Sequence, residues 1–200
     1  MSAGDGDGQM VAPLDIDRLV AARNLHRSDS YDEAFHEVAA RIEHAGSVGK
    51  ADIGALLFWK RLRADTPWAA ALNQVSESEV RQITARAVRA ARDDTVTTAE
   101  AASAARNALT PLPGFTTGDA LASAVIAASA PRRMAVYDRR AHAALRKLLG
   151  RDIGHSPGRY RRYMTEIVGV LEAVQAHNPG WTARDVDITL FWLGGQENGS

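Results

Sequence analysis

The chain has 200 residues, equal numbers of acidic and basic side chains, and 46% hydrophobic residues. This length and composition allow one well-buried core, and the zero net charge argues against indiscriminate electrostatic binding to nucleic acid. The absence of cysteine excludes disulfides, a thiol nucleophile, cysteine zinc sites and a cysteine-bound iron-sulfur cluster.

The N-terminal segment is rich in glycine and aspartate and has no hydrophobic periodicity. We therefore expect a disordered tail over residues 1–13. It has no basic stretch followed by an apolar one, as a secretion signal would, and no apolar run in the chain approaches the length of a membrane span. These features predict no membrane association and a cytoplasmic protein, associated with the nucleoid if the source is a bacterium.

Helical periodicity recurs through the rest of the chain. The predicted helices begin near Asp15, Ser30, Lys50, Thr66, Ser76, Thr97, Asp119, Arg139, Arg159 and Thr182. Three of these starts have a Ser or Thr followed three residues later by Glu, the pattern of a capping box. The apolar run after Lys50 predicts a helix to Arg63, and Gly194-Gly195 is expected to end the last helix after Leu193.

No alternating strand pattern and no internal repeat occurs in the sequence. We therefore predict an all-α protein with a single compact domain over residues 14–195. It should contain about eight to ten helices arranged around a helix-hairpin-helix. A short polar tail is expected over residues 196–200.

The stretch from Leu112 to Leu145 differs most from plain helical scaffold. Its first part combines helix breakers with two glycines able to adopt positive φ, which predicts a compact hairpin with exposed backbone N–H groups. The hairpin residues are Leu112, Pro113, Gly114, Phe115, Thr116, Thr117 and Gly118. Exposed backbone N–H groups of this kind bind phosphate.

A helix rich in small residues is predicted from Asp119 to Ala130, and Pro131 follows it. Next comes a short extended run, Met134 to Tyr137. Asp138 then lies where an N-cap belongs, because the following residues repeat at helical spacing until Gly150.

The order of these parts resembles the helix-hairpin-helix DNA glycosylases, the superfamily that includes endonuclease III. Leu112-Pro113-Gly114 matches the opening of the family's hairpin, Ala122 to Ile126 matches the start of its second helix, and Asp138 matches its catalytic aspartate. Two features depart from the pattern. The second hairpin glycine is displaced to Gly118, and the Asp119-Ala120 region replaces the lysine with which bifunctional members form a Schiff base.

The resemblance implies a DNA base-excision N-glycosylase that acts on double-stranded DNA. We expect the protein to be a monomer. The target base is flipped out of the stack, and its N-glycosidic bond breaks through an oxocarbenium-like transition state. Asp138 would stabilise the positive charge and orient water. Because the hairpin has no lysine, hydrolysis without lyase activity is expected. No cofactor is expected, apart from a potassium or sodium ion that the hairpin carbonyls could bind.

The resemblance also implies which side chains meet the DNA. Phe58, Trp59, Lys60 and Arg61 are candidates for a wedge that fills the space of the flipped base. Tyr137, with Phe58 and Trp59, is expected to line the base pocket.

The segment from Pro131 to Thr165 is strongly basic, with ten basic residues against two acidic ones. This basic segment is expected to face phosphate, because arginine is a good bidentate phosphate ligand. The candidates for contacts to the DNA backbone are Arg132, Arg133, Arg139 and Arg140. A GC-rich genome would also explain the preference for arginine over lysine.

Each assignment has a simpler alternative. Asp138 could serve only as a helix cap, and the hairpin could be an ordinary connection between helices. Phe58 to Arg61 could be a core aromatic followed by a solvated basic pair. In that case the protein would be a non-catalytic hairpin module that grips DNA, or a helical protein-interaction domain.

Other enzyme classes fit the sequence less well. The histidines form no His-Glu-x-x-His pair, and His36 and His44 are expected on the surface rather than on a metal. The sequence has no Gly-x-x-x-x-Gly-Lys phosphate loop and no Gly-x-Ser-x-Gly nucleophile elbow.

Overall fold

The computed structural model describes residues 14–25, 29–155 and 157–196, and within these ranges the chain forms ten α-helices and no β-strand. The helices are α1 (Ile16–Leu25), α2 (Asp29–Ala45), α3 (Lys50–Trp59), α4 (Pro67–Gln74), α5 (Glu77–Arg92), α6 (Thr98–Leu109), α7 (Ala120–Ser129), α8 (Arg139–Leu149), α9 (Arg159–Gln175) and α10 (Ala183–Gln196). The all-α prediction is confirmed. The tail predicted at 1–13 lies outside the described residues, and so do residues 197–200 of the tail predicted at 196–200. Gln196, the first residue of that predicted tail, belongs to α10 instead. None of the described helices is long and apolar enough to cross a bilayer.

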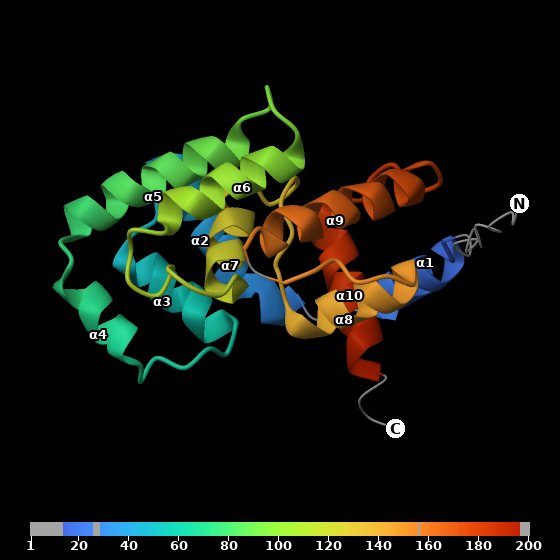
Figure 1. The fold of residues 1–200 in the computed structure, drawn as a ribbon, viewed down its shortest axis with the longest axis horizontal. Coiled ribbons are helices and arrows are strands. Elements are labelled where there is room, and N and C mark those ends of the chain that lie inside the picture. Colours follow the sequence, from blue (N-terminus) through green and yellow to red (C-terminus); the bar gives the residue numbers. More distant parts are fainter. Residues whose placement is uncertain (1–13, 26–28, 156, 197–200) are drawn as a thin grey trace, which may run out of the picture.

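Helix α7 is the centre of the fold (Figure 1). Every residue from Leu121 to Ser129 is buried, and α2, α3, α5 and α6 all pack against this helix. Its alanines allow neighbouring helices to approach closely, as the sequence predicted.

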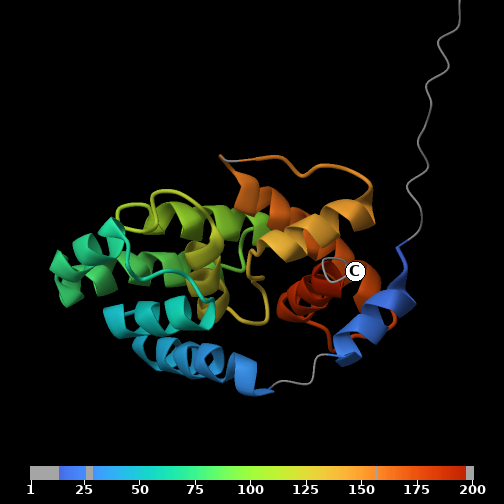
Figure 2. The same ribbon diagram turned by 90° about the horizontal axis from the view of Figure 1, so that it is seen from below.

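Helices α1, α8, α9 and α10 gather at the other end of the molecule. Helix α10 packs against α8, α9 and the N-terminal α1, and α9 also contacts α6. Figure 2 shows this group on one side and α2 to α6 on the other. The chain passes from α7 to α8 through residues 130–138, and this passage includes the extended run that the sequence predicted.

Local capping signals fixed several helix ends as predicted. Thr97 Oγ1 accepts a hydrogen bond from Glu100 N at 3.3 Å while the Glu100 carboxylate accepts one from Thr97 N at 3.1 Å, so this capping box is complete. Ser76 Oγ accepts from Glu79 N at 3.2 Å. Gly150 ends α8 in the left-handed conformation, with φ 65°.

The predicted helix from Lys50 to Arg63 was too long, because α3 ends at Trp59. Leu62 N donates to Leu57 O at 3.0 Å and Arg61 N donates to Phe58 O at 2.9 Å, the two bonds of a Schellman motif. Arg61 has φ 53° in this motif, a left-handed position that usually holds glycine. Because an arginine stands where a glycine is usual, the sequence did not indicate that the helix ends here.

The predicted end of the last helix at Gly194-Gly195 was also wrong, because α10 continues through both glycines to Gln196. A Cβ on Gly194 would lie only 2.5 Å from the carbonyl oxygen of Arg140. Position 194 requires glycine because α10 crosses the start of α8 at very short distance. Gly194 does not end α10.

Candidate functional site

Among the residues that the structure describes, the extended run Met134 to Tyr137 has no strand partner. Side chains from four different parts of the fold hold its backbone. Tyr160 Oη of α9 donates to Ala135 O at 2.8 Å, and Val136 N donates to Asp187 Oδ2 of α10 at 2.6 Å. Tyr137 N donates to Ser123 Oγ of α7 at 2.9 Å, and Lys60 Nζ, just after α3, donates to Tyr137 O at 3.1 Å. These bonds fix the direction in which the chain enters Asp138.

Asp138 is the N-cap of α8, as predicted, and it also faces a cavity. Its Oδ1 accepts a hydrogen bond from Arg140 N at 2.8 Å. Its Oδ2 accepts one from Lys60 Nζ at 3.1 Å, and its side chain is 31% exposed. The capping role and a role in the cavity are compatible, because each uses a different oxygen.

Lys60 is part of the site, and its side chain contacts the Asp138 carboxylate. The sequence suggests it as part of a wedge toward DNA, yet its side chain is only 7% exposed and turns inward to Asp138. Burial lowers the pKa of Lys60, while the nearby Asp138 carboxylate acts in the opposite direction. A buried lysine beside a carboxylate is a common feature of reactive sites.

The cavity in front of Asp138 has a volume of about 680 Å³, within the usual range for small-molecule sites. Aromatic and charged side chains line it: Tyr31, Trp59, Lys60, Arg61, Asp138, Arg140, Arg184, Asp187, Phe191 and Trp192. Of the predicted wedge and pocket residues, the structure therefore brings Trp59, Lys60 and Arg61 to Asp138.

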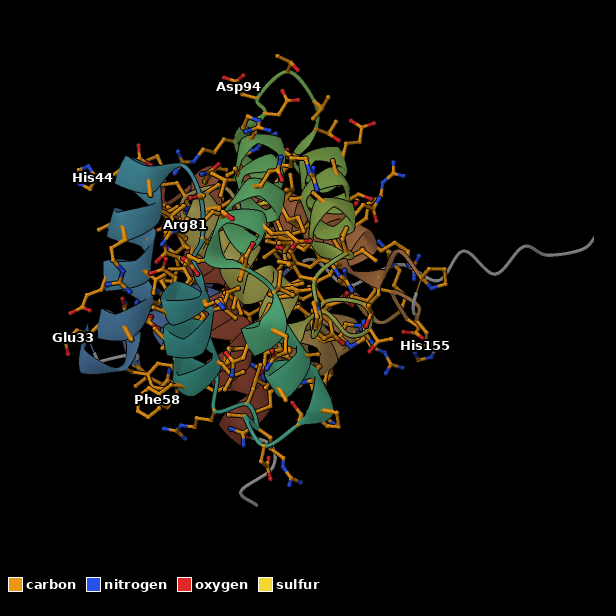
Figure 3. All side chains as sticks on the ribbon, turned by 90° about the vertical axis from the view of Figure 1, so that its left-hand side faces the viewer. Glu33, His44, Phe58, Arg81, Asp94 and His155 are labelled. Atoms are coloured by element: carbon orange, nitrogen blue, oxygen red, sulfur yellow. The ribbon has the colours of Figure 1, made fainter. Side chains whose placement is uncertain are left out.

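Two predicted pocket residues lie elsewhere. Phe58 is 80% exposed and points away from the molecule (Figure 3), and it is not among the residues that line the cavity. The ring of Tyr137 is buried on the other side of the extended run, where it packs edge-on against Tyr163 and beneath the Arg159 guanidinium at 4.6 Å. Neighbouring residues in an extended chain point to opposite sides, so Asp138 and Tyr137 cannot both face the cavity.

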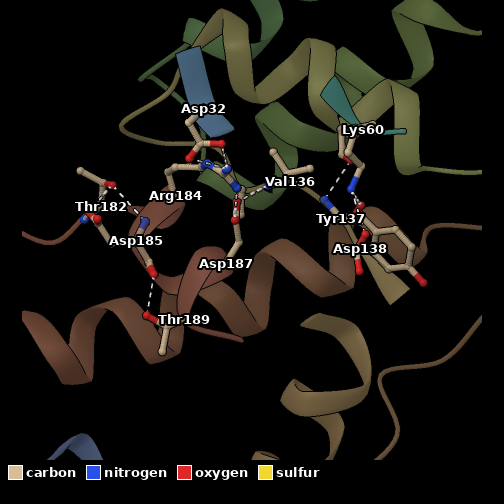
Figure 4. A network of polar contacts seen from close by, with 12 residues as sticks. Asp32, Lys60, Val136, Tyr137, Asp138, Thr182, Arg184, Asp185, Asp187 and Thr189 are labelled. Carbon is tan, nitrogen blue, oxygen red and sulfur yellow. Dashed lines mark hydrogen bonds and ion pairs between the residues drawn. The ribbon is translucent and has the colours of Figure 1, made fainter. Parts of the chain in front are cut away.

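A buried charge cluster lies beside the Lys60–Asp138 pair, on the other side of Val136 (Figure 4). Arg184 Nη2 donates to both carboxylate oxygens of Asp32, at 2.8 and 3.0 Å, and Arg184 Nη1 donates to Asp187. Trp59 Nε1 also donates to Asp32, at 3.0 Å. Burial raises the pKa of Asp187 to about 6, against the opposing effect of Arg184. No sequence signal marked this cluster, because Asp32 and Arg184 are 152 residues apart.

The predicted hairpin is present between α6 and α7, and its two glycines have the expected positive φ, 87° at Gly114 and 76° at Gly118. Leu112 and Phe115 are fully buried and anchor it to the core. Thr116, Thr117 and Gly118 are exposed, and within the described ranges their backbone N–H groups have no hydrogen-bond partner. The hairpin therefore presents free N–H groups, as phosphate binding requires.

The carbonyl side of the hairpin is bonded to a fixed positive charge. Arg106 donates to Phe115 O at 2.8 Å, to Gly118 O at 2.9 Å and to Asp119 at 3.2 Å. Asp119 also accepts from Arg159 at 2.8 Å. The Arg106 guanidinium thus donates hydrogen bonds to two hairpin carbonyl oxygens. The resemblance implied that carbonyls of this hairpin could bind a potassium or sodium ion.

The four arginines expected on DNA do not form one surface. Arg139 and Arg140 follow Asp138 directly, and the Arg140 guanidinium lies 5.5 Å from the ring centre of Phe191 at the cavity. Arg132 and Arg133 follow the C-terminal end of α7. Arg133 donates to Val96 O at 2.7 Å and to Thr98 Oγ1 at 3.2 Å, so it binds the loop before α6, at the opposite end of that helix from the hairpin.

The part of the chain that the structure describes contains no group of three or more His, Asp or Glu side chains able to hold a metal ion. His36 and His44 are exposed on α2, as predicted, and His44 is visible at the surface in Figure 3.

No protein-family model, no curated protein and no solved structure matches this chain. What the site can do is therefore inferred from its own geometry and from the residues of the hairpin segment.

Proposed function

We propose that the protein is a DNA base-excision N-glycosylase, which hydrolyses the N-glycosidic bond of a flipped damaged or modified base. The observation that supports this most is the position of Asp138. It projects from a rigidly held segment into a cavity large enough for a small molecule, at the same end of α7 as the hairpin. Ser123, which anchors Tyr137, lies only one helical turn after Asp119, where the hairpin ends.

The chemistry needs one carboxylate next to the anomeric carbon of the extruded nucleotide. As the base departs, positive charge develops on the sugar, and a fixed carboxylate stabilises it better than mobile water does. Asp138 is held by Arg140 N–H and by Lys60, so its orientation is set before the substrate arrives. The same carboxylate can orient the attacking water.

The other groups around the cavity suit an extruded nucleotide. Phe191 and Trp192, which are both partly exposed, provide flat surfaces on which a base can stack. Arg61 and Arg140 also line the cavity and are exposed, so they can pair with the phosphates on either side of the flipped nucleotide. The free N–H groups of the hairpin would hold a further phosphate.

A hairpin module that binds DNA without catalysis is the second candidate. It is favoured by the observation that both oxygens of Asp138 already have partners, the first turn of α8 and Lys60. In that case Asp138 would stabilise the structure, and the cavity would bind no substrate.

Single-turnover incubation with modified duplexes distinguishes the two candidates. The duplexes contain uracil, hypoxanthine, an alkylated adenine, an oxidised guanine or a modified cytosine, and alkali then cuts any abasic site. For a glycosylase, Asp138→Asn should abolish excision of the preferred base and keep DNA affinity. The exposed Asp152, which does not line the cavity, provides the matched control Asp152→Asn, which should keep full activity.

The remaining outcomes identify the alternatives. Salt-dependent DNA binding without excision of any base would favour the non-catalytic module. A protein that neither binds DNA nor removes a base would fit a helical protein-interaction domain.

A further inference from the structure

The cavity beside Asp138 carries an excess of positive charge. The charged side chains that line it are Lys60, Arg61, Arg140, Arg184, Asp138 and Asp187. Lys60 pairs with Asp138 at 3.1 Å, and Arg184 pairs with Asp187. Within the part of the chain that the structure describes, Arg61 and Arg140 have no ion-pair partner. These two guanidiniums are therefore the charges of the cavity that a ligand would meet without breaking a pair.

An aromatic ring supports each of these two arginines. The Arg61 guanidinium lies over the ring of Tyr31 and the Arg140 guanidinium over that of Phe191, each 5.5 Å from the ring centre. Both rings also line the cavity. A guanidinium held over a ring by its face keeps the N–H donors of its edge for a ligand. Because that edge matches phosphate bidentately, the cavity suits a phosphate group.

The rest of the lining suits a flat group next to this phosphate. Phe191 and Trp192 are partly exposed at the cavity, so an aromatic base can stack on them. The Asp138 carboxylate repels phosphate but accepts hydrogen bonds from hydroxyl groups, so a sugar fits beside it. Pockets of roughly 300–1,000 Å³ enclose most of a drug-sized molecule, which includes a nucleotide, and this cavity has about 680 Å³.

These groups form a complete nucleotide site without a neighbouring duplex surface. Outside the cavity, Arg133 is bonded to the loop before α6, and Arg106 is bonded to the hairpin carbonyls. The net charge of the chain is zero, whereas a face that grips a long duplex is strongly basic. The contacts available to a single nucleotide thus lie in the cavity itself, which favours a small free ligand.

We propose that the cavity binds a free nucleoside monophosphate. Its phosphate lies on the arginines Arg61 and Arg140, and its base stacks on Phe191 and Trp192. A phosphate monoester carries about −1.5 to −2 charges at neutral pH, which the two guanidiniums balance. The ligand is a separate molecule and no part of a duplex, so the proposal goes beyond base excision from DNA. It rests on the proposed function only in placing the sugar at Asp138.

Calorimetric titration of the full-length protein in the absence of DNA tests the proposal. The probes are the 5′-monophosphates of deoxyadenosine, deoxyguanosine, deoxycytidine and thymidine, the matching nucleosides, and inorganic phosphate. At least one monophosphate should bind with a Kd in the micromolar range. The matching nucleoside should bind more than about tenfold more weakly, because it lacks the charged group. Inorganic phosphate should also bind more weakly, because it has no base to stack.

A double variant tests whether the arginines of the cavity hold the phosphate. Arg61→Asn combined with Arg140→Gln removes both charges, and asparagine tolerates the left-handed conformation of position 61, with φ 53°. Its affinity for the monophosphate should fall more than about tenfold. Arg139→Gln is the matched control, because Arg139 is exposed next to Arg140 but does not line the cavity. It should bind like the unsubstituted protein, and circular dichroism checks that each variant is folded.

Four results would overturn the proposal: no monophosphate binds, the nucleoside binds as tightly as its monophosphate, the double variant keeps its affinity, or Arg139→Gln loses as much as the double variant. Failure here is separable from failure of the proposed function. Base excision from a duplex without binding of any monophosphate would reject the free-nucleotide site and leave the glycosylase standing. Binding of a monophosphate without excision of any base would support the site and count against base removal from DNA.

Discussion

Replacing Asp187 with asparagine should remove a specific pH dependence from the stability of the protein. Burial raises the pKa of Asp187 from its ordinary 3.8 to about 6 in the folded state. A raised folded pKa means that the stability contribution is fully present below pH 4 and is lost as the pH rises through about 6. A shift of this size corresponds to about 3 kcal/mol of free energy. The asparagine side chain cannot ionise, and its amide oxygen can still accept the hydrogen bond from Val136 N.

Urea denaturation at intervals between about pH 4 and pH 7 measures this difference. The stability of the original protein minus that of Asp187→Asn should fall by about 3 kcal/mol over this interval. Subtraction removes the contribution of all other titrating groups, provided that both proteins unfold in a single step. A difference that stays constant with pH would show that Arg184 and Val136 N hold Asp187 ionised throughout, and it would refute the reasoning.

Three further substitutions test the packing around the site. Ser123→Ala leaves the buried N–H of Tyr137 without its acceptor, so urea denaturation should show a loss of about 1–3 kcal/mol, and single-turnover excision should slow. Gly194→Ala places a Cβ 2.5 Å from Arg140 O and should cost about 1–3 kcal/mol, measured as a lower melting temperature. Arg61→Gly removes a left-handed arginine, so stability should rise by roughly 1 kcal/mol, while a fluorescence titration should show weaker DNA binding. A stability gain in Gly194→Ala, or a loss in Arg61→Gly, would contradict these readings of the backbone.

Local sequence signals were sufficient to locate most of the helices and the hairpin. The capping residues Ser76 and Thr97, the glycines of the hairpin and the N-cap Asp138 each act on backbone groups within a few residues. Such short-range interactions leave a pattern that can be recognised in the sequence itself.

The interior of the site could not be predicted because it joins distant parts of the chain. Lys60 and Asp138 are 78 residues apart, and their pairing depends on how α3 docks beside α7. Gly194 was interpreted as a helix end, whereas tertiary packing required a glycine at the crossing with α8. Phe58 and Trp59 are adjacent in the sequence, yet one is exposed and the other buried, since the helix turns them in different directions.

The way the extended run is held has a consequence for folding cooperativity. A strand in a sheet keeps most of its hydrogen bonds when a distant helix detaches. Val136 and Tyr137 instead depend on a side chain of α10, which packs with α1, α8 and α9, and on one of α7, which packs with α2, α3, α5 and α6. Any partial opening that separates these two groups of helices therefore also releases the aspartate that follows. In native-state hydrogen exchange, the amides of Val136 and Tyr137 should exchange together and with the free energy of global unfolding. The site would then exist only in the fully assembled fold, so a partly folded chain would carry no active form of it.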